Sequence, residues 1–341
     1  MPCTVPCTVR LTVAMLTYRR PEEVRRALDA VAVQLAEVGS DPTLGVTGEL
    51  LVVDNDPGAS AREVVSAHGV ARYRHEPRPG IAAARNSALA AAAESDLLVF
   101  IDDDEVPEPG WLAGLVRVWR RTGAAGVVGR VVCRFEVEPD AWVLGSELFR
   151  RRHRPTGTPL TTAATNNLLL DLHAVRELDL RFDPSLGRSG GEDTLFTRAL
   201  VRSGASLVWC DEAVVLDMVP AARVTRRFVR VRTWAHGCTS VRMDLRMAAG
   251  PVQRTVVRLL SAASGVARLI GGALAWGRGA VSGDLGMRAR AARTMLRGAG
   301  MLTGAVGLVV EEYADGGPRL RPERRPSGPA VSSRVRPLRA R

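Results

Sequence analysis

The stretch LLVFIDDDEVPEPGW, residues 97–111, places four consecutive carboxylates directly after five apolar residues. Side chains alternate across a strand, so Asp102 and Asp104 are expected on one face and Asp103 on the other. Two carboxylates on one face favour a cation, and oxygen ligands of this kind suit Mg²⁺ or Mn²⁺ shared with substrate phosphates. The alternative is a solvated turn before a helix at 109, because helix N-termini accept acids.

Around this stretch, short apolar runs alternate with helical patterns. The expected strands lie at 9–16, 49–54, 70–75, 96–102, 124–135, 165–171 and 206–211. The expected helices lie at 21–38, 60–69, 80–95, 109–123, 192–204 and 221–245, with two more between 251 and 310. Continuous apolar strands that alternate with helices predict an α/β fold, a Rossmann-like and mostly parallel sheet flanked by helices on both faces.

Polar residues follow several of these strands. In open α/β sheets, ligands bind beyond the carboxyl ends of the strands. Thr17, Tyr18 and Arg19 follow the first strand, and Asp54 ends the second. We expect these side chains to converge with the acids at 102–105 on one crevice.

The first strand is followed by TYRRPEE, which contains no glycine. A dehydrogenase-type dinucleotide site requires G-x-G-x-x-G at this point, so that class is excluded. Asp54 in VVDND suits a nucleoside, although Asp-Asn-Asp-Pro is also a common turn. The chain has no lysine, so Walker A, Schiff-base and pyridoxal phosphate chemistry are excluded as well.

Two further motifs carry polar groups near helix starts. In SGGEDTLFTRAL, Glu192 and Asp193 open a helix after two glycines. One of the two acids is a candidate general base, while acids in a first helical turn are also ordinary. In HEPRPGIAAARNSAL, a glycine-led helix start is surrounded by Arg78, Arg85 and Asn86. Helix N-termini and arginine both suit a phosphate, although surface arginine on an alanine-rich helix is also ordinary.

In this order, the motifs TYRR, VVDNDP, EPRPGIAAARNSAL, FIDDDE, TNN and GGED resemble those of inverting family-2 glycosyltransferases with the GT-A fold. The resemblance covers residues 9–245 and is closest to the group of succinoglycan-type exopolysaccharide glucosyltransferases. It implies transfer of a sugar from a nucleotide-diphosphate donor, with a UDP-sugar favoured, to an acceptor hydroxyl.

The resemblance also implies roles for residues on the nucleotide side. Thr17, Tyr18 and Arg19 look like the loop that lines the nucleotide pocket. Asp54 is similar to the acid that hydrogen-bonds the nucleobase. Arg85 matches a basic position near the nucleotide.

The remaining roles concern the metal and the acceptor. Asp102 and Asp104 resemble the DxD motif that binds Mn²⁺ or Mg²⁺ on the diphosphate, with Asp102 also facing the ribose. Asp103 fills the variable place and shares the nucleotide contact if the register differs by one. Asp193 matches the catalytic base, with Glu192 beside it. The chemistry agrees, because an acceptor hydroxyl needs a positioned base and a leaving diphosphate needs a cation.

The C-terminal part carries the basic character. Residues 251–341 hold 16 arginines and five acids, so the net charge of +11 belongs to them and residues 1–250 are neutral. The apolar run 259–277 is nearly long enough to span a bilayer, but Arg268 lies at its centre. We expect helices lying on an anionic membrane surface, which suits a polyprenyl-linked glycan acceptor. The alternative is a helical cap on the catalytic domain.

Three regions follow: a catalytic domain (1–245), a helical, apolar and arginine-rich extension that associates with membranes (246–312), and a disordered basic tail (313–341). The run 11–16 is too short to be an export signal or a span. Five scattered cysteines show neither zinc spacing nor a disulfide framework. We expect a cytoplasmic protein, peripheral to the inner face of the cell membrane.

Two other classes remain open. A sugar nucleotidyltransferase also uses a nucleotide, a metal and clustered acids, but it relies on a basic glycine-rich loop after the first strand. A nucleic-acid binder using the arginine-rich tail predicts salt-sensitive affinity. That class leaves both acidic clusters unexplained, so no nucleic-acid partner is expected.

Overall fold

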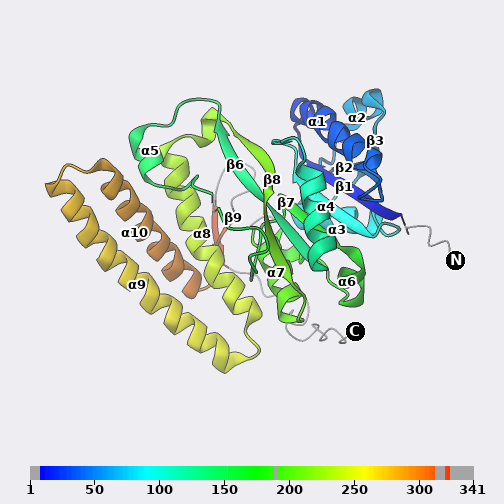
Figure 1. The fold of residues 1–341 in the computed structure, drawn as a ribbon. Helices are drawn as coiled ribbons and strands as arrows, with labels where there is room; N and C mark the ends of the chain where they lie inside the picture. The colour runs from blue at the N-terminus through cyan, green and yellow to red at the C-terminus, as the bar shows by residue number, and fades with distance from the viewer. Residues whose placement is uncertain (1–7, 152, 188–189, 312–318, 323–341) are drawn as a thin grey trace.

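The computed structural model describes residues 8–151, 153–187, 190–311 and 319–322. Within them, an eight-stranded sheet runs in the order β3-β2-β1-β4-β7-β6-β8-β5, with helices on both faces (Figure 1). Its strands are β1 (Val9–Thr17), β2 (Val46–Asp54), β3 (Ala71–His75), β4 (Leu97–Asp102), β5 (Glu105–Pro107), β6 (Gly126–Phe135), β7 (Asn167–Asp171) and β8 (Leu207–Val219). The predicted α/β class, of the GT-A type, is confirmed.

The helices alternate with the strands in the first half of the chain and then extend beyond the sheet. They are α1 (Pro21–Ser40), α2 (Arg62–His68), α3 (Ile81–Ala91), α4 (Trp111–Thr122), α5 (Ala141–Gly145), α6 (Leu172–Glu177), α7 (Glu192–Arg202), α8 (Arg226–Met247), α9 (Pro251–Val281) and α10 (Leu285–Ala305). Two short 3₁₀ helices are η1 (Pro184–Leu186) and η2 (Ala221–Arg223). Of these elements, α5 and α6 are too short to show a helical period in the sequence.

The two faces of the sheet have separate cores. Leu11, Val13 and Met15 of β1 point to the face covered by α1, α2 and α4. Ala14 of the same strand points to the other face, which α3, α6 and α7 cover. Because side chains on both faces of the sheet are buried, the central strands are continuous apolar runs in the sequence, without alternation of apolar and polar residues.

The sheet is parallel from β3 to β4 and mixed beyond it. Strand β7 pairs antiparallel with both β4 and β6, while β6 and β8 are parallel to each other. Strand β8 continues to Val219, past the predicted end at Asp211, because its second half alternates between buried and exposed side chains. Glu105 of β5 lies opposite Asp217 of this extension.

The acidic stretch itself corrects one expectation. Strand β4 ends at Asp102, and the chain turns at Asp103 and Asp104 before β5 begins. The strict alternation that predicted Asp102 and Asp104 on one face therefore stops at Asp102. The turn frees Asp103 and Asp104 to point to a common partner.

The C-terminal helices form a layer beside the sheet, with α10 between α8 and the outermost helix α9 (Figure 1). Helix α8 runs to Met247, so the proposed boundary at 245 falls in its last turn. The predicted helical stretch up to 310 ends earlier, because Leu308–Glu311 form strand β9. Strand β10 (Arg319–Pro322) pairs with β9, which corrects the expected disorder there; the rest of the tail lies outside the described residues.

Candidate active site

Register places the predicted residues at one edge of the sheet. Thr17 lies opposite Asp54 in the β1–β2 pair, and Leu16 lies opposite Asp102 in the β1–β4 pair. The parallel strands thus end together, as the sequence predicted. Three of the candidate residues meet at the carboxyl edge for this reason alone.

One guanidinium joins the two acids of the turn. Arg20 Nη1 lies 3.1 Å from Asp103 Oδ1 and 2.9 Å from Asp104 Oδ2. Thr17 Oγ1 donates to the other oxygen of Asp103 at 2.8 Å. Burial raises the pKa of Asp103 to about 6, against the attraction of Arg20. The turn is therefore held to the end of β1 by one hydroxyl and one cation.

A second arginine reaches the same carboxylate from far along the chain. Arg223, at the end of η2, lies 3.3 Å from Asp104 Oδ2. Neither Arg20 nor Arg223 was among the predicted site residues. Arg20 was visible in the TYRR motif, whereas Arg223 is 119 residues from Asp104 and has no local signal.

Asp102 lies among further acids that the sequence analysis did not assign. Its backbone N–H donates to Glu105 Oε2 at 3.2 Å, and Asn166 donates to the other oxygen of Glu105 at 2.6 Å. Burial raises the pKa of Asp102 to about 7, against the attraction of Arg85. The pKa of Glu105 is raised well above its usual range by burial and by Asp102 and Asp217. These carboxyls therefore hold their protons more readily than free acids do, and a cation bound beside them would favour their ionised forms.

Arg85 connects the two predicted acidic motifs. Its guanidinium is buried, and Nη1 donates to Glu192 Oε1, which is equally buried. Burial works against its charge, but Glu192, Asp193 and Asp102 outweigh that effect and raise the pKa of Arg85. The two acidic motifs, some ninety residues apart, thus both act on the charge of one arginine. Arg85 was predicted near a nucleotide; the structure places it in a buried ion pair with Glu192.

Glu192 and Asp193 have different surroundings. The second oxygen of Glu192 is buried without a hydrogen-bond partner among the described residues, and burial raises the pKa of its carboxyl. Asp193 is half-buried, and its Oδ1 accepts only from the N–H of Thr194, at 2.6 Å, among the hydrogen bonds of the described chain. Asp193 is therefore the more accessible acid of this pair.

The glycines before these acids are required by the backbone. Gly190 and Gly191 have φ of 73° and 94°, in the left-handed region. A Cβ on Gly191 would lie 2.9 Å from Met243 Sδ on α8. Helix α8 thus packs directly on the turn that presents Asp193.

Asp54 differs from its prediction. It is fully buried, and its oxygens accept from the N–H groups of Asp56 and Ala61 and from the hydroxyl of Tyr73, at 3.0, 2.8 and 3.0 Å. In this conformation no atom of the carboxylate is exposed to a nucleobase. A carboxylate at a strand end satisfies the backbone of the loop that follows, and the sequence pattern does not separate that task from ligand binding.

Tyr18 and Arg19 form the exposed part of the loop after β1. Tyr18 is 42% exposed, and the guanidinium carbon of Arg19 lies 5.0 Å from the centre of its ring. Arg19 Nε donates to Asp56 Oδ1 at 3.0 Å. Asp56 is thus a second acid of VVDND that faces this loop, unlike Asp54.

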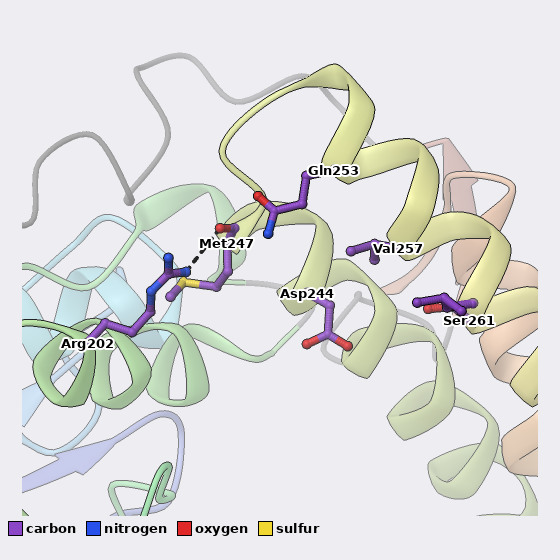
Figure 2. Close-up of a pocket in the computed structure, with 7 residues that line it drawn as sticks. Arg202, Asp244, Met247, Gln253, Val257 and Ser261 are labelled. Carbon is purple, nitrogen blue, oxygen red and sulfur yellow. Dashed lines mark hydrogen bonds between the residues drawn. The ribbon is translucent and has the colours of Figure 1, made fainter.

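A cavity of about 310 Å³ lies elsewhere, between α7, α8 and α9 (Figure 2). It is lined by Arg202, the last residue of α7, whereas Asp193 is at the start of that helix. Arg202 donates to the carbonyl of Met247 at 3.1 Å, and Asp244 pairs with Arg198 at 2.6 Å. Arg202 and Asp244 are thus bonded within the protein, and none of the predicted site residues lines this cavity.

Comparison with known proteins agrees with the motifs. Residues 12–173 match the model of the family described as glycosyl transferase family 2. The succinoglycan biosynthesis protein ExoM of Rhizobium meliloti (strain 1021) is 32% identical over 266 residues, which cover 76% of this chain and 82% of that protein. The chain belongs to glycosyl transferase family 2.

A solved structure shows a weaker likeness to this glycosyltransferase. It is a crystal structure of GalNAc-T7 with UDP, GalNAc and Mn²⁺, 15% identical, with a TM-score of 0.47. The match covers 69% of the glycosyltransferase chain and 51% of the GalNAc-T7 chain. Similarity at this level says nothing about the ligands of the present enzyme.

The matched region of the glycosyltransferase includes the acids at 102–105 and Arg85. It ends before Glu192 and Asp193. The contact between Arg85 and Glu192 is therefore the structural link between the family region and the second acidic motif.

Proposed function

We propose that this glycosyltransferase moves a sugar from a nucleotide-diphosphate donor, a UDP-sugar, to an acceptor hydroxyl with inversion at the anomeric carbon. The observation that carries the proposal is the buried ion pair of Arg85 with Glu192, whose guanidinium charge is also stabilised by Asp102 and Asp193. It supports two sets of carboxylates with different tasks that lie within electrostatic range of one cation. A direct displacement requires such a division between the leaving group and the nucleophile.

Asp193 is proposed as the general base. An acceptor hydroxyl has a pKa far above neutrality, so its proton must pass to a positioned group as the new bond forms. Asp193 is the more accessible acid, whereas one oxygen of Glu192 is bonded to Arg85. Glu192 is proposed to hold the charge and orientation of Arg85 rather than to accept the proton.

Asp102 and Asp104 are proposed to hold a divalent metal, Mn²⁺ or Mg²⁺. The fit is supported by four consecutive acids at this strand end, where burial and the neighbouring acids raise the pKa of Asp102, so that a bound cation would stabilise its ionised form. In the described part of the chain no group of three or more His, Cys, Asp or Glu side chains could hold a metal ion. Two carboxylates suffice for a metal whose other ligands come from the donor's phosphates. When bound, such an ion stabilises charge on the leaving diphosphate as a Lewis acid.

The nucleotide is proposed to lie over the loop after β1. Thr17 fixes Asp103 through its hydroxyl, and Tyr18 and Arg19 present an exposed ring and guanidinium beside it. Asp102 is proposed to face the ribose as well as the metal, and Asp103 to share the nucleotide contact. The predicted nucleobase contact of Asp54 requires the loop after β2 to open, because the carboxylate is enclosed there.

The acceptor is proposed to be a lipid-linked glycan, in exopolysaccharide or glycoconjugate assembly. The name of the succinoglycan relative supports the pathway class. The C-terminal helices support a membrane location at the cytoplasmic leaflet. Among the described residues, α9 is the helix long and apolar enough to cross a membrane, by length and composition.

Helix α9 has two unlike faces. Its buried residues are small and face inward: Ser261, Gly265, Gly272 and Gly279. The exposed side carries large apolar residues such as Leu259, Leu260, Ile270 and Leu274. Because α9 packs along α10 over its length, we propose that it lies on an anionic membrane surface with this exposed side in the lipid. Its arginines attract the headgroups.

The test is a panel of UDP-, GDP- and dTDP-sugars, each with Mn²⁺ or Mg²⁺, measured by thermal stabilisation of the purified chain. A ligand at 100 times its Kd adds about 2.7 kcal/mol to the free energy of unfolding. The expected result is stabilisation by a UDP-sugar with metal, and release of UDP on transfer. Release of pyrophosphate from UTP and a sugar 1-phosphate would instead establish a nucleotidyltransferase.

A further inference from the structure

Three of the six phenylalanines of the chain meet beneath the active site. The ring of Phe182 stacks on Phe196 with centroids 4.2 Å apart and planes 9° apart. The ring of Phe182 also meets Phe100 edge to face, with centroids 6.0 Å apart and planes at 88°. Such pairs stabilise beyond the area they bury, and Phe182 is fully buried. Phe182 therefore ties β4 to α7.

The strand and helix periods place two of these three rings on the same faces as the acids. Phe100 is two residues before Asp102, so both point to the same face of β4. Phe196 is four residues after Glu192, so both lie on the same face of α7. A shift of Phe182 is thus transmitted to both acidic motifs.

Arg85 stands over the same ring. Its guanidinium carbon lies 5.6 Å from the centre of Phe182, within the range of a cation–π contact. The cation that pairs with Glu192 therefore lies against the ring that connects β4 to α7.

The position of Phe182 itself is fixed by one side chain. Asn86, next to Arg85 on α3, donates from Nδ2 to the carbonyl of Phe182 at 2.8 Å and accepts from its N–H at 2.9 Å. The amide thus satisfies both backbone groups of a residue 96 positions away. Near it, a Cβ on Gly80 would lie 3.4 Å from the Cα of Gly187, so α3 and the loop before α7 touch at their backbones as well.

We infer that Asn86 is a positioning residue that sets the separation between Asp102 and Asp193 through Phe182. The inference rests on the proposed roles of these two acids. Asn86 is half-buried and touches neither acid in the described structure. A displacement of about 1 Å at a reacting group lowers turnover by up to about 100-fold, so the effect of losing this amide falls on kcat.

The test compares Asn86→Ala and the isosteric Asn86→Asp with wild type, using UDP release from UDP-glucose in Mn²⁺ and calorimetric binding of UDP. Asn86→Asp keeps the acceptor for the Phe182 N–H and loses the donor, so it guards against misfolding of the alanine variant. The matched control is Arg176→Ala. Arg176 also makes two bonds to distant carbonyls, of Ala93 and Ser95 at 3.0 and 3.1 Å, before β4 begins.

The expected result is a fall in kcat of about 10- to 100-fold for Asn86→Ala, with KM and UDP affinity within about two-fold of wild type. The kcat of Asn86→Asp lies between those of wild type and Asn86→Ala. Arg176→Ala keeps the kcat of wild type, although it loses about as much thermal stability as Asn86→Ala. Unchanged kcat in both Asn86 variants, or a loss that Arg176→Ala reproduces, overturns the inference.

A double variant separates this inference from the proposed function. If Asn86 acts through Asp193, then Asn86→Ala with Asp193→Asn is no slower than Asp193→Asn alone. Losses that multiply contradict positioning through this acid. If Asp193→Asn alone is fully active, the base assignment fails, whereas the kcat of Asn86→Ala still reports on the positioning of the rest of the site.

Discussion

The arginines of the catalytic half of this glycosyltransferase are paired with acids, whereas those of the C-terminal helices α9 and α10 greatly outnumber the acids. In the catalytic half, Arg20, Arg85 and Arg223 each lie against carboxylates, and Arg85 is buried with its partner Glu192. In the helical pair α9–α10, eight arginines accompany one acid, Asp284, in the connection between the helices. The first set holds acids in place, and the second leaves a net positive surface.

This difference shows that the role of an arginine depends on its surroundings and not on residue type alone. A buried guanidinium is tolerated only where acids compensate for lost water, so its task is local and geometric. An arginine on an exposed helix keeps its water and acts at longer range on anionic surfaces. The four predictions below test this division, from the largest expected effect to the smallest.

Arg85→Met is expected to abolish transfer and lower the free energy of unfolding by about 3–5 kcal/mol, because it leaves Glu192 as a buried, unpaired carboxylate. Urea unfolding and UDP release measure the two effects. The double variant Arg85→Met with Glu192→Gln is expected to regain much of the stability and none of the activity. If the single variant has the free energy of unfolding of wild type, the ion pair of Arg85 with Glu192 does not stabilise the fold.

Asp104→Ala and Asp193→Asn are each expected to lower transfer by about 100- to 10,000-fold, the range for loss of a catalytic group. Only Asp104→Ala should weaken the Mn²⁺-dependent binding of UDP, because Asp193 is proposed to act on the acceptor side. Calorimetry with UDP and Mn²⁺ checks the distinction. Equal UDP affinity in the two variants contradicts the division of roles.

Ile270→Glu is expected to weaken binding to vesicles of anionic phospholipid by about ten-fold or more, because burial of such a side chain contributes about 1.5–3 kcal/mol. UDP release from a soluble donor should not change. The matched control is Val33→Glu on α1, which is 56% exposed against 59% for Ile270. Sedimentation with vesicles compares them, and an equal loss for both variants argues against a specific lipid-facing side of α9.

Two neighbouring glycines of α9 are expected to respond with opposite signs to substitution by alanine. A Cβ on Gly272 would lie 2.5 Å from Met295 Cγ on α10, whereas a Cβ on Gly271 meets nothing within 4 Å. Gly271→Ala should therefore raise the free energy of unfolding by about 0.5–1 kcal/mol, the helical preference of alanine. Gly272→Ala should lower it, and activity on a soluble donor should persist in both. Chemical denaturation measures the free energy of unfolding of both variants. Equal changes in this free energy would mean that α9 and α10 do not pack as described.

Part of this structure was readable directly from the chain. The dry strands β1, β2 and β4 appear as apolar runs, and their parallel order brings Thr17, Asp54 and Asp102 to one edge. The motif around Asp193 and the basic C-terminal region were also visible, because residue type and local spacing carry both signals.

Other features depend on contacts between distant residues. Asp103 and Asp104 share Arg20 because the chain turns after β4, where a strand period predicts opposite faces. Asp54 is enclosed by the loop after β2, although the same residues also fit a nucleobase contact.

The sequence by itself determined the layers of the fold, the edge where the acids gather and the side of the chain that carries the charge. Local periodicity and hydrophobicity decide these, since each is a property of neighbouring residues. Only the tertiary structure decided which cation meets which acid: Arg223 with Asp104, and Arg85 with Glu192, are 119 and 107 residues apart. Ion pairing depends on distance and burial, and no local pattern in the chain encodes either for such pairs.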